Sequence, residues 1–321
     1  MIMKRFVAKI MSHQLIGVAS ILIALFIGSC FASEYFLTAY NMLIVTRTLA
    51  FIALITIGQS LLMILGELDL SLGSISGLCG IIGGILMVQK GVNPFVAFFF
   101  CLLCGILLGF VNGLLVTKLK LSSLVLTIGM TGVYSGTILV LTKGLAITGI
   151  PETISFLGKG VYGGVPTPFI IMLVLLVIIT FVTQKTPFGR YIYAIGNSAQ
   201  AARMLGIKVD RIRVVCFMIA GFLASLAGML MVARLGTSQP SIGAVWVLPP
   251  IAAAVIGGVA TTGGVGTPIG AIIGAAIIGI IQNIIVLFGI SPYWQSVVSG
   301  VIVVCAISFD SISRQYFKKE V

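Results

Sequence analysis

The chain of 321 residues is 59% hydrophobic and only 8% charged, whereas about a quarter of the residues in a typical soluble domain are charged. So little charge cannot cover a water-facing surface of this size, which excludes a soluble globular protein. The formal charge of +12 also fits a membrane protein, because lysine and arginine collect in its cytoplasmic loops. We expect an all-α membrane protein with a single transmembrane domain over residues 1–321 and no nucleic-acid partner.

Apolar runs of about 20 residues, the length that crosses a bilayer as a helix, recur along the whole chain. The continuous runs are 15–32, 48–65, 95–116, 122–142, 167–183, 212–233, 268–288 and 292–309. Glycines interrupt two further runs, 68–88 and 248–260. The sequence therefore predicts about ten transmembrane helices, two of them glycine-broken.

The first run has two interpretations. Basic residues precede it and the small residues of 28–33 follow it, as in a signal peptide or a lipoprotein cleavage site. We favour a first transmembrane helix, because removing the segment would leave an odd number of spans and spoil the charge balance.

The basic residues orient the spans. With both termini in the cytoplasm, the outer side receives only Arg47, Lys90, Lys143, Lys159 and Arg234. All other lysines and arginines fall inside, including those of the long loop at about 185–211. This asymmetry predicts a multi-pass membrane protein with an even number of spans and both termini cytoplasmic. The longest outer loop is then 143–165.

The first glycine-broken run begins with the most polar piece at any span boundary, residues 66–74. An acid at a helix start accepts hydrogen bonds from free N–H groups and suits the positive end of the helix dipole. Irregular backbone persists in a membrane only where protein or water covers it. We expect Asp69, Ser71, Gly73 and Ser74 to cap a broken helix that lines a pathway, with substrate contact as a second, compatible role.

A glycine-rich turn follows the second broken run, which opens with Pro249 and Pro250. We assign four of its glycines to the pathway as well: Gly257, Gly258, Gly263 and Gly264. They do not form a phosphate-binding loop, because no lysine follows them in the required spacing. Without a nucleotide-binding loop in this chain, any ATP must be hydrolysed by another chain. A proton relay is disfavoured as the energy source, because no span centre carries an acid.

Residues 105–116, which include Gly109 and Asn112, resemble residues 275–286, which include Gly279 and Asn283. In the predicted topology the two copies cross the membrane in opposite directions. Inverted repeats of this kind are typical of transporters with a central pathway.

A basic island, residues 188–207, separates two long apolar runs. Asn197 or Ser198 is placed to cap a helix over 199–205, and Gly206 followed by Ile207 is placed to end it. Ala202 and Leu205, three residues apart, suggest a docking face. A capped cytoplasmic helix on a chain without a nucleotide site predicts an ATPase partner.

A set of ordered motifs between about residues 35 and 309 resembles the permease subunits of bacterial ATP-binding-cassette sugar importers of the ribose, galactose and xylose type. The motifs are Asp69-Leu-Ser-Leu-Gly73-Ser74, residues 189–197 with 201–207, residues 221–228, Ala233-Arg234-Leu with Gln239-Pro240, and Gly257-Gly258 with Gly263-Gly264-Val-Gly266. Ser198 stands where family members often carry asparagine, a mild departure. The resemblance also implies a location in the bacterial inner membrane.

The resemblance implies a non-enzymatic transport subunit for a monosaccharide or related small polar solute. Its implied partners are cytoplasmic ATPase chains that hold ATP and Mg, an extracytoplasmic substrate-binding protein, a second identical or related permease, and membrane lipid. It implies ATPase coupling through Gly196, Asn197, Ala201, Ala202, Arg203, Gly206 and Ile207. We expect loop 143–165 to meet the binding protein, and no cofactor or metal in this chain.

Other functions stay open at this stage. The chain could act as a stand-alone facilitator or channel, or carry nucleosides or a furanosyl signalling compound instead of a sugar. Trp246, Trp294, Tyr293 and Tyr134 are candidates for stacking on a sugar, although aromatic residues at the membrane interface have the same distribution. A membrane enzyme is disfavoured, because no span carries a nucleophile with a base.

Overall fold

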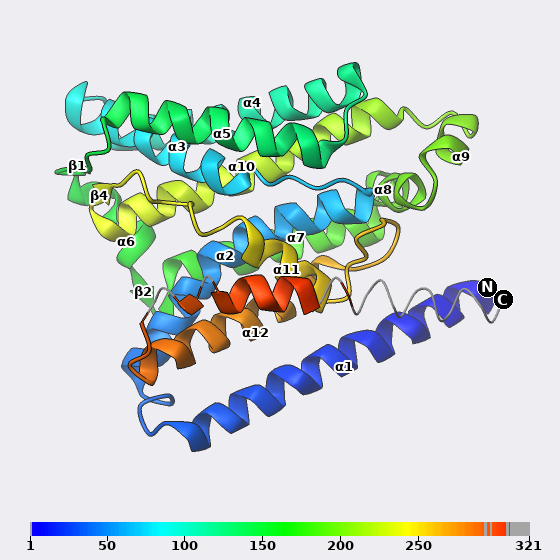
Figure 1. Cartoon of the computed structure of the whole chain (residues 1–321), viewed down its shortest axis with the longest axis horizontal. Coiled ribbons are helices and arrows are strands. Elements are labelled where there is room, and N and C mark those ends of the chain that lie inside the picture. The colour runs from blue at the N-terminus through cyan, green and yellow to red at the C-terminus, as the bar shows by residue number, and fades with distance from the viewer. Residues whose placement is uncertain (1, 292–293, 296, 306–307, 309–321) are drawn as a thin grey trace.

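A computed structural model describes residues 2–291, 294–295, 297–305 and 308, and the chain is an assembly of helices lying side by side (Figure 1). Among these residues, 8 helical segments are long and apolar enough to cross a membrane. They are α1 (Ile2–Ala32), α2 (Ala39–Leu65), α3 (Leu72–Gly84) continued by a π-helical turn (Ile85–Gln89), α4 (Pro94–Leu119), α5 (Ser123–Thr142), α7 (Thr167–Lys185), α10 (Val209–Leu235) and α12 (Pro268–Leu287). The predicted all-α, multi-pass membrane class is confirmed.

The short elements gather at the two ends of the bundle (Figure 1). One end carries a 3₁₀ turn (Glu152–Ile154), α6 (Ser155–Lys159) and the antiparallel pairs β1 (Ile147–Thr148) with β4 (Thr237–Ser238) and β2 (Val161–Tyr162) with β3 (Val165–Pro166). The other end carries α8 (Pro187–Asn197) and α9 (Ala199–Met204). The predicted outer loop and the basic island therefore lie at opposite ends, as the alternation of spans requires.

Helix α2 forms the centre of the bundle. Every residue from Ala50 to Leu65 is buried, and α7, α8, α10, α11 and α12 all pack against this helix. A helix that is apolar on every side is stable only when protein or lipid surrounds it. Around it the helices approach closely through small residues, most clearly where Gly105 and Gly109 of α4 touch α10.

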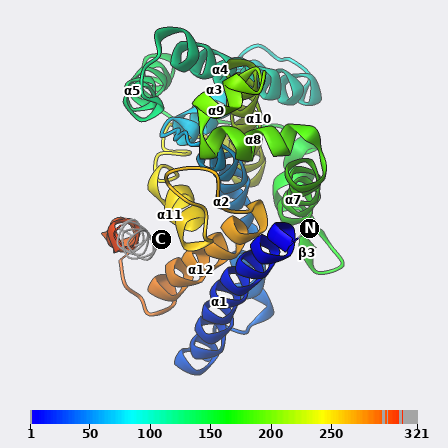
Figure 2. The same cartoon turned by 90° about the vertical axis from the view of Figure 1, so that its right-hand side faces the viewer.

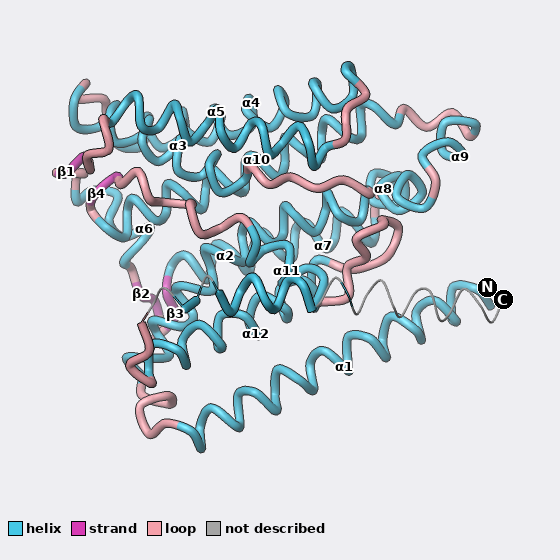
Figure 3. Tube along the Cα trace, in the orientation of Figure 1, coloured by secondary structure: helices cyan, strands magenta, loops and turns pink. Residues whose placement is uncertain are grey.

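Two spans are discontinuous, and the pink loop stretches inside the bundle in Figure 3 mark them. The first leaves α2 at Gly66, runs without helix through 67–71 from the α8 end of the bundle, and continues as α3. The second leaves β4, runs inward through 239–247, and continues as α11 (Leu248–Ile256). The two spans enter from opposite ends, which is the arrangement that inverted repeats produce.

The prediction of two broken spans is correct, but the break in the second one lies elsewhere than expected. Helix α11 has 9 residues, about half of what a crossing needs. Two prolines stand in its first turn, where they suit a helix start. The residues ahead of them form turns that include Gly243 at φ 82°. The break therefore precedes α11, and the glycines of 257–266 form the connection to α12.

Helices α4 and α12, which hold the repeated sequence, run in opposite directions (Figure 1). Of the last predicted span, 292–309, residues 297–305 are helical. Residues 292–293, 296, 306–307 and 309 of that span lie outside the described part of the chain.

Candidate functional site

The two discontinuous spans meet at the start of α3, backbone against backbone. A Cβ atom on Gly73 would collide with the carbonyl oxygen of Gly243, and a Cβ atom on Gly243 would collide with the carbonyl oxygen of Gly73. Gly77, one turn further along α3, lies equally close to the carbonyl oxygen of Ile242. Only glycine allows this approach, because any side chain would separate the two spans.

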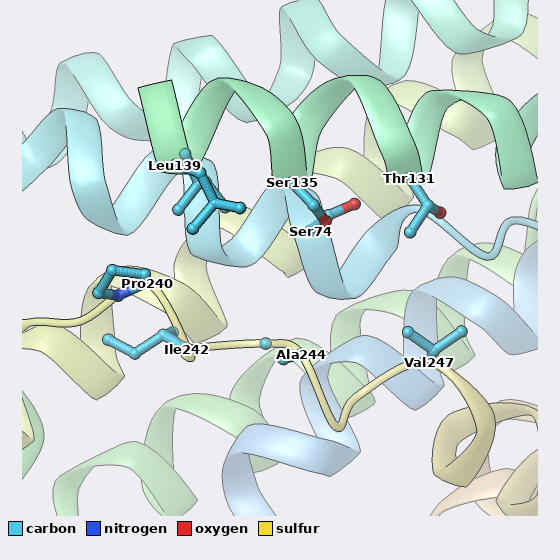
Figure 4. Close-up of a pocket in the computed structure, with 10 residues that line it drawn as sticks. Ser74, Thr131, Ser135, Leu139, Pro240, Ile242, Ala244 and Val247 are labelled. Atoms are coloured by element: carbon cyan, nitrogen blue, oxygen red, sulfur yellow. The ribbon is translucent and has the colours of Figure 1, made fainter. Parts of the chain in front are cut away.

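A cavity of about 220 Å³ lies beside this crossing, between α3, α5 and the segment 240–247 (Figure 4). We call it the hydroxyl cavity. One wall carries the hydroxyl groups of Ser74, Thr131 and Ser135. The wall facing them is apolar and is lined by Pro240, Ile242, Ala244 and Val247. The cavity thus offers hydrogen-bonding oxygen on one side and hydrocarbon on the other.

A larger cavity of about 710 Å³ borders the same segment and shares Ala244 and Val247 with the hydroxyl cavity. Its polar lining comes from α2, α12 and the last described residues: Thr48, Gln282, Gln295 and Ser299. Trp246 also lines it and stacks on Phe51, with ring centroids 6.2 Å apart and planes 9° apart. Of the predicted aromatic residues, Trp246 is thus the one beside a cavity, while Trp294 is exposed and Tyr293 lies outside the described residues.

Asp69 lies in a buried network next to the crossing and does not line either cavity. Its Oδ1 accepts hydrogen bonds from the backbone N–H of Ser71 at 2.7 Å and from the Ser71 hydroxyl at 2.6 Å. Asn112 of α4 donates to Asp69 Oδ2 at 3.2 Å and to Ser71 Oγ at 2.8 Å. Tyr134 donates to Asn112 Oδ1 at 2.8 Å. Asp69 and Asn112 therefore hold Ser71, the residue just before α3, in place. The Ser71 side chain itself does not cap the helix, because it accepts no hydrogen bond from the first turn of α3.

The same network ties the irregular segment 67–71 to α5. The backbone N–H groups of Leu68 and Leu70 donate to the hydroxyl oxygens of Ser123 and Thr127, both at 3.1 Å. A backbone segment buried in a membrane domain needs such partners, because an unpaired N–H group there costs several kcal/mol, roughly. The roles of Asn112, Ser123 and Thr127 were not predicted from the sequence.

At the α8 end of the bundle, the basic island forms two short helices. The Ser198 hydroxyl caps α9 by accepting from the Ala201 N–H at 3.2 Å. Gly206 ends the helix at φ 79°, and the Ile207 N–H donates to the Ala202 carbonyl at 3.1 Å. The predicted cap and stop are confirmed, with Ser198 as the capping residue rather than Asn197.

The predicted docking pair, Ala202 and Leu205, does not share a face. Ala202 is 2% exposed and packs into the body, whereas Leu205 is 79% exposed. The helix ends at Met204, so the i, i+3 rule no longer places Leu205 above Ala202. The exposed apolar surface is formed instead by Leu205 and Met204, which is 78% exposed, with Arg203 beside them.

Four glycines connect the island to both discontinuous spans; we call Gly66, Gly196, Gly263 and Gly264 the glycine joint. A Cβ atom on Gly196 would collide with the Ile64 carbonyl and the Gly264 N–H, and one on Gly263 would collide with Gly66. The Gly264 N–H donates to the Ile64 carbonyl at 2.8 Å. The end of α8 thus touches the chain where the first discontinuous span begins and where the second ends.

Side chains on both sides of the glycine joint reinforce it. The Tyr193 hydroxyl of α8 donates to the Gly266 carbonyl at 2.7 Å, and burial raises its pKa to about 12, so it stays a donor at neutral pH. Asn197 packs against Gly264. Glu67 and Arg213 form an ion pair at 2.6 Å between the first discontinuous span and α10. The island is therefore joined to the bundle by tight packing and not by a flexible loop.

The residues that the sequence assigned to the pathway lie at separate places in the fold. Gly73 lies at the crossing and Ser74 lines the hydroxyl cavity, whereas Gly263 and Gly264 belong to the glycine joint. Gly257 packs against Gly270 at the start of α12, and Gly258 follows it at φ 84°. The late glycines thus lie where α11 connects to α12, away from the crossing.

Comparison with known proteins gives consistent matches over most of the chain. The family model described as branched-chain amino acid transport system / permease component matches residues 41–307. The ribose import permease protein RbsC of Bacillus subtilis (strain 168) is 37% identical over 278 residues, covering 86% of each chain. The autoinducer 2 import system permease protein LsrC of Photorhabdus laumondii is 34% identical, covering 84% of this chain and 80% of that protein. LsrC of Escherichia coli (strain K12 / DH10B) is 33% identical, covering 91% and 85%. The chain belongs to this family of transport-system permease components.

Proposed function

We propose that the chain is the transmembrane permease subunit of an ATP-binding-cassette importer for a monosaccharide or a related small hydroxylated solute. The names of its relatives support this class, since they are import permeases for ribose and autoinducer 2. The hydroxyl cavity supports the same class from the chemistry of its walls. The family description mentions branched-chain amino acids, but no ionisable side chain lines this cavity to hold their ammonium and carboxylate groups.

The observation that carries the proposal is the glycine joint. An importer driven by a separate ATPase needs a segment that contacts the ATPase and also moves the pathway. The end of α8 touches the start of the first discontinuous span and the connection that follows the second, and Met204 and Leu205 of the adjoining turn are exposed. In this proposal the residues from Gly196 to Ile207 form the coupling segment, and a partner ATPase holds ATP and Mg. The segment at about 143–165, at the opposite end, receives the binding protein.

A second permease subunit, identical or related, completes the pathway in this proposal. Figure 2 shows α5 and the helix of residues 297–305 on one side of the bundle, with α11 between them. Helix α5 is largely exposed there, and a Cβ atom added to Gly129, Gly132 or Gly136 would meet nothing within 4 Å beyond the backbone of its own helix. Small residues of this kind permit close helix packing in lipid. Residues of α5 line the hydroxyl cavity, and Gln295 and Ser299 line the larger cavity, so a second copy on this side would lie beside both.

The proposed location is the inner membrane of a bacterial cell, with both termini and the coupling segment in the cytoplasm. The arrangement follows the excess of basic residues at the α8 end of the bundle. Reversing the orientation would place the coupling segment outside, where no ATP-driven partner operates.

Reconstitution tests the proposal. The permease, its ATPase and its binding protein are placed in liposomes, and ATP hydrolysis is measured with monosaccharides, nucleosides and branched-chain amino acids. We expect a monosaccharide or a related hydroxylated compound to stimulate hydrolysis and to accumulate inside. Stimulation by amino acids alone would contradict the solute class. Uptake by the permease without an ATPase would show a facilitator instead.

A further inference from the structure

We propose that the hydroxyl cavity is a solute-binding station inside the permease, at which Thr131 and Ser135 of α5 and Ser74 of α3 hold the hydroxyl groups of a single sugar ring. This inference rests on the proposed function and names the residues that contact the solute. A cavity of about 220 Å³ is smaller than the roughly 300–1,000 Å³ that drug-sized ligands occupy. It therefore suits one small ring and not a larger conjugate.

The hydroxyl wall presents acceptors to the cavity. Ser74 donates its own proton to the Ser71 carbonyl at 2.9 Å, and Thr131 donates to the Thr127 carbonyl at 2.8 Å. Because both hydroxyl protons are already donated to backbone carbonyl groups, the two oxygens can only accept hydrogen bonds from a ligand. Such a wall favours ligands that donate, as sugar hydroxyls do, and disfavours carboxylates, which only accept.

Ser135 is the third hydroxyl residue of this wall, and unlike the other two it can still donate a hydrogen bond to a ligand. Its side chain lines the same cavity as Ser74 (Figure 4), and within the described residues its hydroxyl has no protein partner. It can therefore donate or accept, which suits a hydroxyl that both gives and receives a hydrogen bond. Two acceptors and one adaptable group match neighbouring hydroxyls on one edge of a ring.

The apolar wall suits the rest of such a ligand. Pro240, Ile242 and Val247 present hydrocarbon opposite the hydroxyl groups. A sugar ring carries C–H groups on its faces, and their burial against hydrocarbon is favourable in proportion to area. Ligand sites generally combine such apolar lining with a few placed polar groups.

The position of the cavity places a bound solute between the two discontinuous spans. Ser74 belongs to the first discontinuous span and Ile242 to the second, so a bound ring touches both. Through the glycine joint, α8 contacts the start of the first span and the connection that leads from the second span to α12. A shift of one span against the other therefore changes the width of the cavity and the hold on the solute.

The test uses the complete importer in liposomes, with D-ribose, D-galactose and D-xylose as probes. The variants are Thr131→Val, Ser135→Ala and their combination. Each lost hydrogen bond is expected to lower uptake per ATP about fivefold, which corresponds to roughly 1 kcal/mol. Thr137→Val is the matched control, because Thr137 lies on the same helix, makes the same bond to the carbonyl four residues earlier at 2.8 Å, and does not line the cavity. It should transport like the wild type.

A second measurement does not depend on the rate of transport. Ser135→Cys and Thr137→Cys are labelled with a thiol reagent in the assembled importer, with the unsubstituted chain as the background for native cysteines. The probe that is transported should slow labelling at position 135 and leave position 137 unchanged. Equal labelling with and without solute, together with wild-type uptake by the Thr131→Val/Ser135→Ala variant, would overturn the station and leave the permease function standing. Absence of ATP-driven sugar uptake in the wild type would contradict both proposals.

Discussion

Gly73 and Gly243 touch through their backbones, with each carbonyl oxygen standing where a side chain on the other would lie. Together with the contact of Gly77 with Ile242, this contact holds the first turns of α3 against the irregular segment 239–247. Because no side chain intervenes, their relative position is set by the backbone itself. The hydroxyl cavity lies beside this contact, and its shape depends on it.

Gly243→Ala should therefore destabilise the permease. The methyl group would collide with Gly73, and the residue sits at φ 82°, which alanine rarely adopts. Overpacking of this kind costs about 1–3 kcal/mol, so the melting temperature in detergent should fall. Gly17→Ala is the control, since its position on α1 has no neighbouring atom within 4 Å. An unchanged melting temperature for Gly243→Ala would show that the spans are free to separate.

Leu205→Asp should abolish binding of the ATPase without affecting the fold of the permease. Leu205 is 79% exposed, so the charge costs little in the free permease but is costly in a protein interface. The measurement is co-purification of the ATPase with the tagged permease. Tyr162→Asp is the control, because Tyr162 is 60% exposed at the opposite end of the bundle. If the ATPase binds both variants equally, α9 and its turn are not the docking surface.

The loss of solute-stimulated ATP hydrolysis on replacing Gly206 should be smaller for a residue that tolerates a positive φ. Gly206 sits at φ 79° with open space around it, so backbone strain is the main cost of a substitution. Asparagine tolerates this conformation better than a β-branched residue does. Solute-stimulated ATP hydrolysis should fall more for Gly206→Val than for Gly206→Asn, while both permeases remain folded and show a cooperative melting transition. Equal hydrolysis by the two variants would argue against a required turn geometry.

Tyr134→Phe should weaken the anchoring of α3. The change removes the hydrogen bond to Asn112 Oδ1 and leaves that buried oxygen without its donor, a loss of about 1–3 kcal/mol. We expect a lower melting temperature and faster hydrogen exchange at the start of α3. Thr137→Val, on the same helix and outside the network, serves as the control. A Tyr134→Phe variant with normal stability but altered sugar selectivity would instead favour the original expectation that Tyr134 contacts the sugar.

Local rules predicted much of the architecture. The long apolar runs gave the spanning helices, and the pattern Ser198 to Gly206 gave a helix start and stop that the structure contains. These features depend on neighbours within a few residues, so they can be predicted from the sequence alone. The excess of basic residues likewise predicted that the basic island and loop 143–165 face opposite sides of the membrane. In the structure the two segments lie at opposite ends of the bundle.

Features that depend on contacts between distant segments could not be predicted. Asn112 joins Asp69 across 43 positions, and nothing near either residue signals the other. Thr131 and Ser135 resemble the other hydroxyl residues of α5, which mostly bond to their own helix. The late glycines suggested a pathway because glycine marks irregular backbone, but the fold uses Gly263 and Gly264 for close packing against Gly196.

The burial of α2 has a consequence for the order in which the protein is made. Residues 50–65 are enclosed by α10, α11 and α12, which the ribosome synthesises much later. Until those helices are made, the sides of α2 that they cover face lipid. The largely apolar surface of α2 makes this delay tolerable, since lipid can take the place of each missing helix. The biogenesis of the permease therefore requires the same apolar surface that its finished core requires.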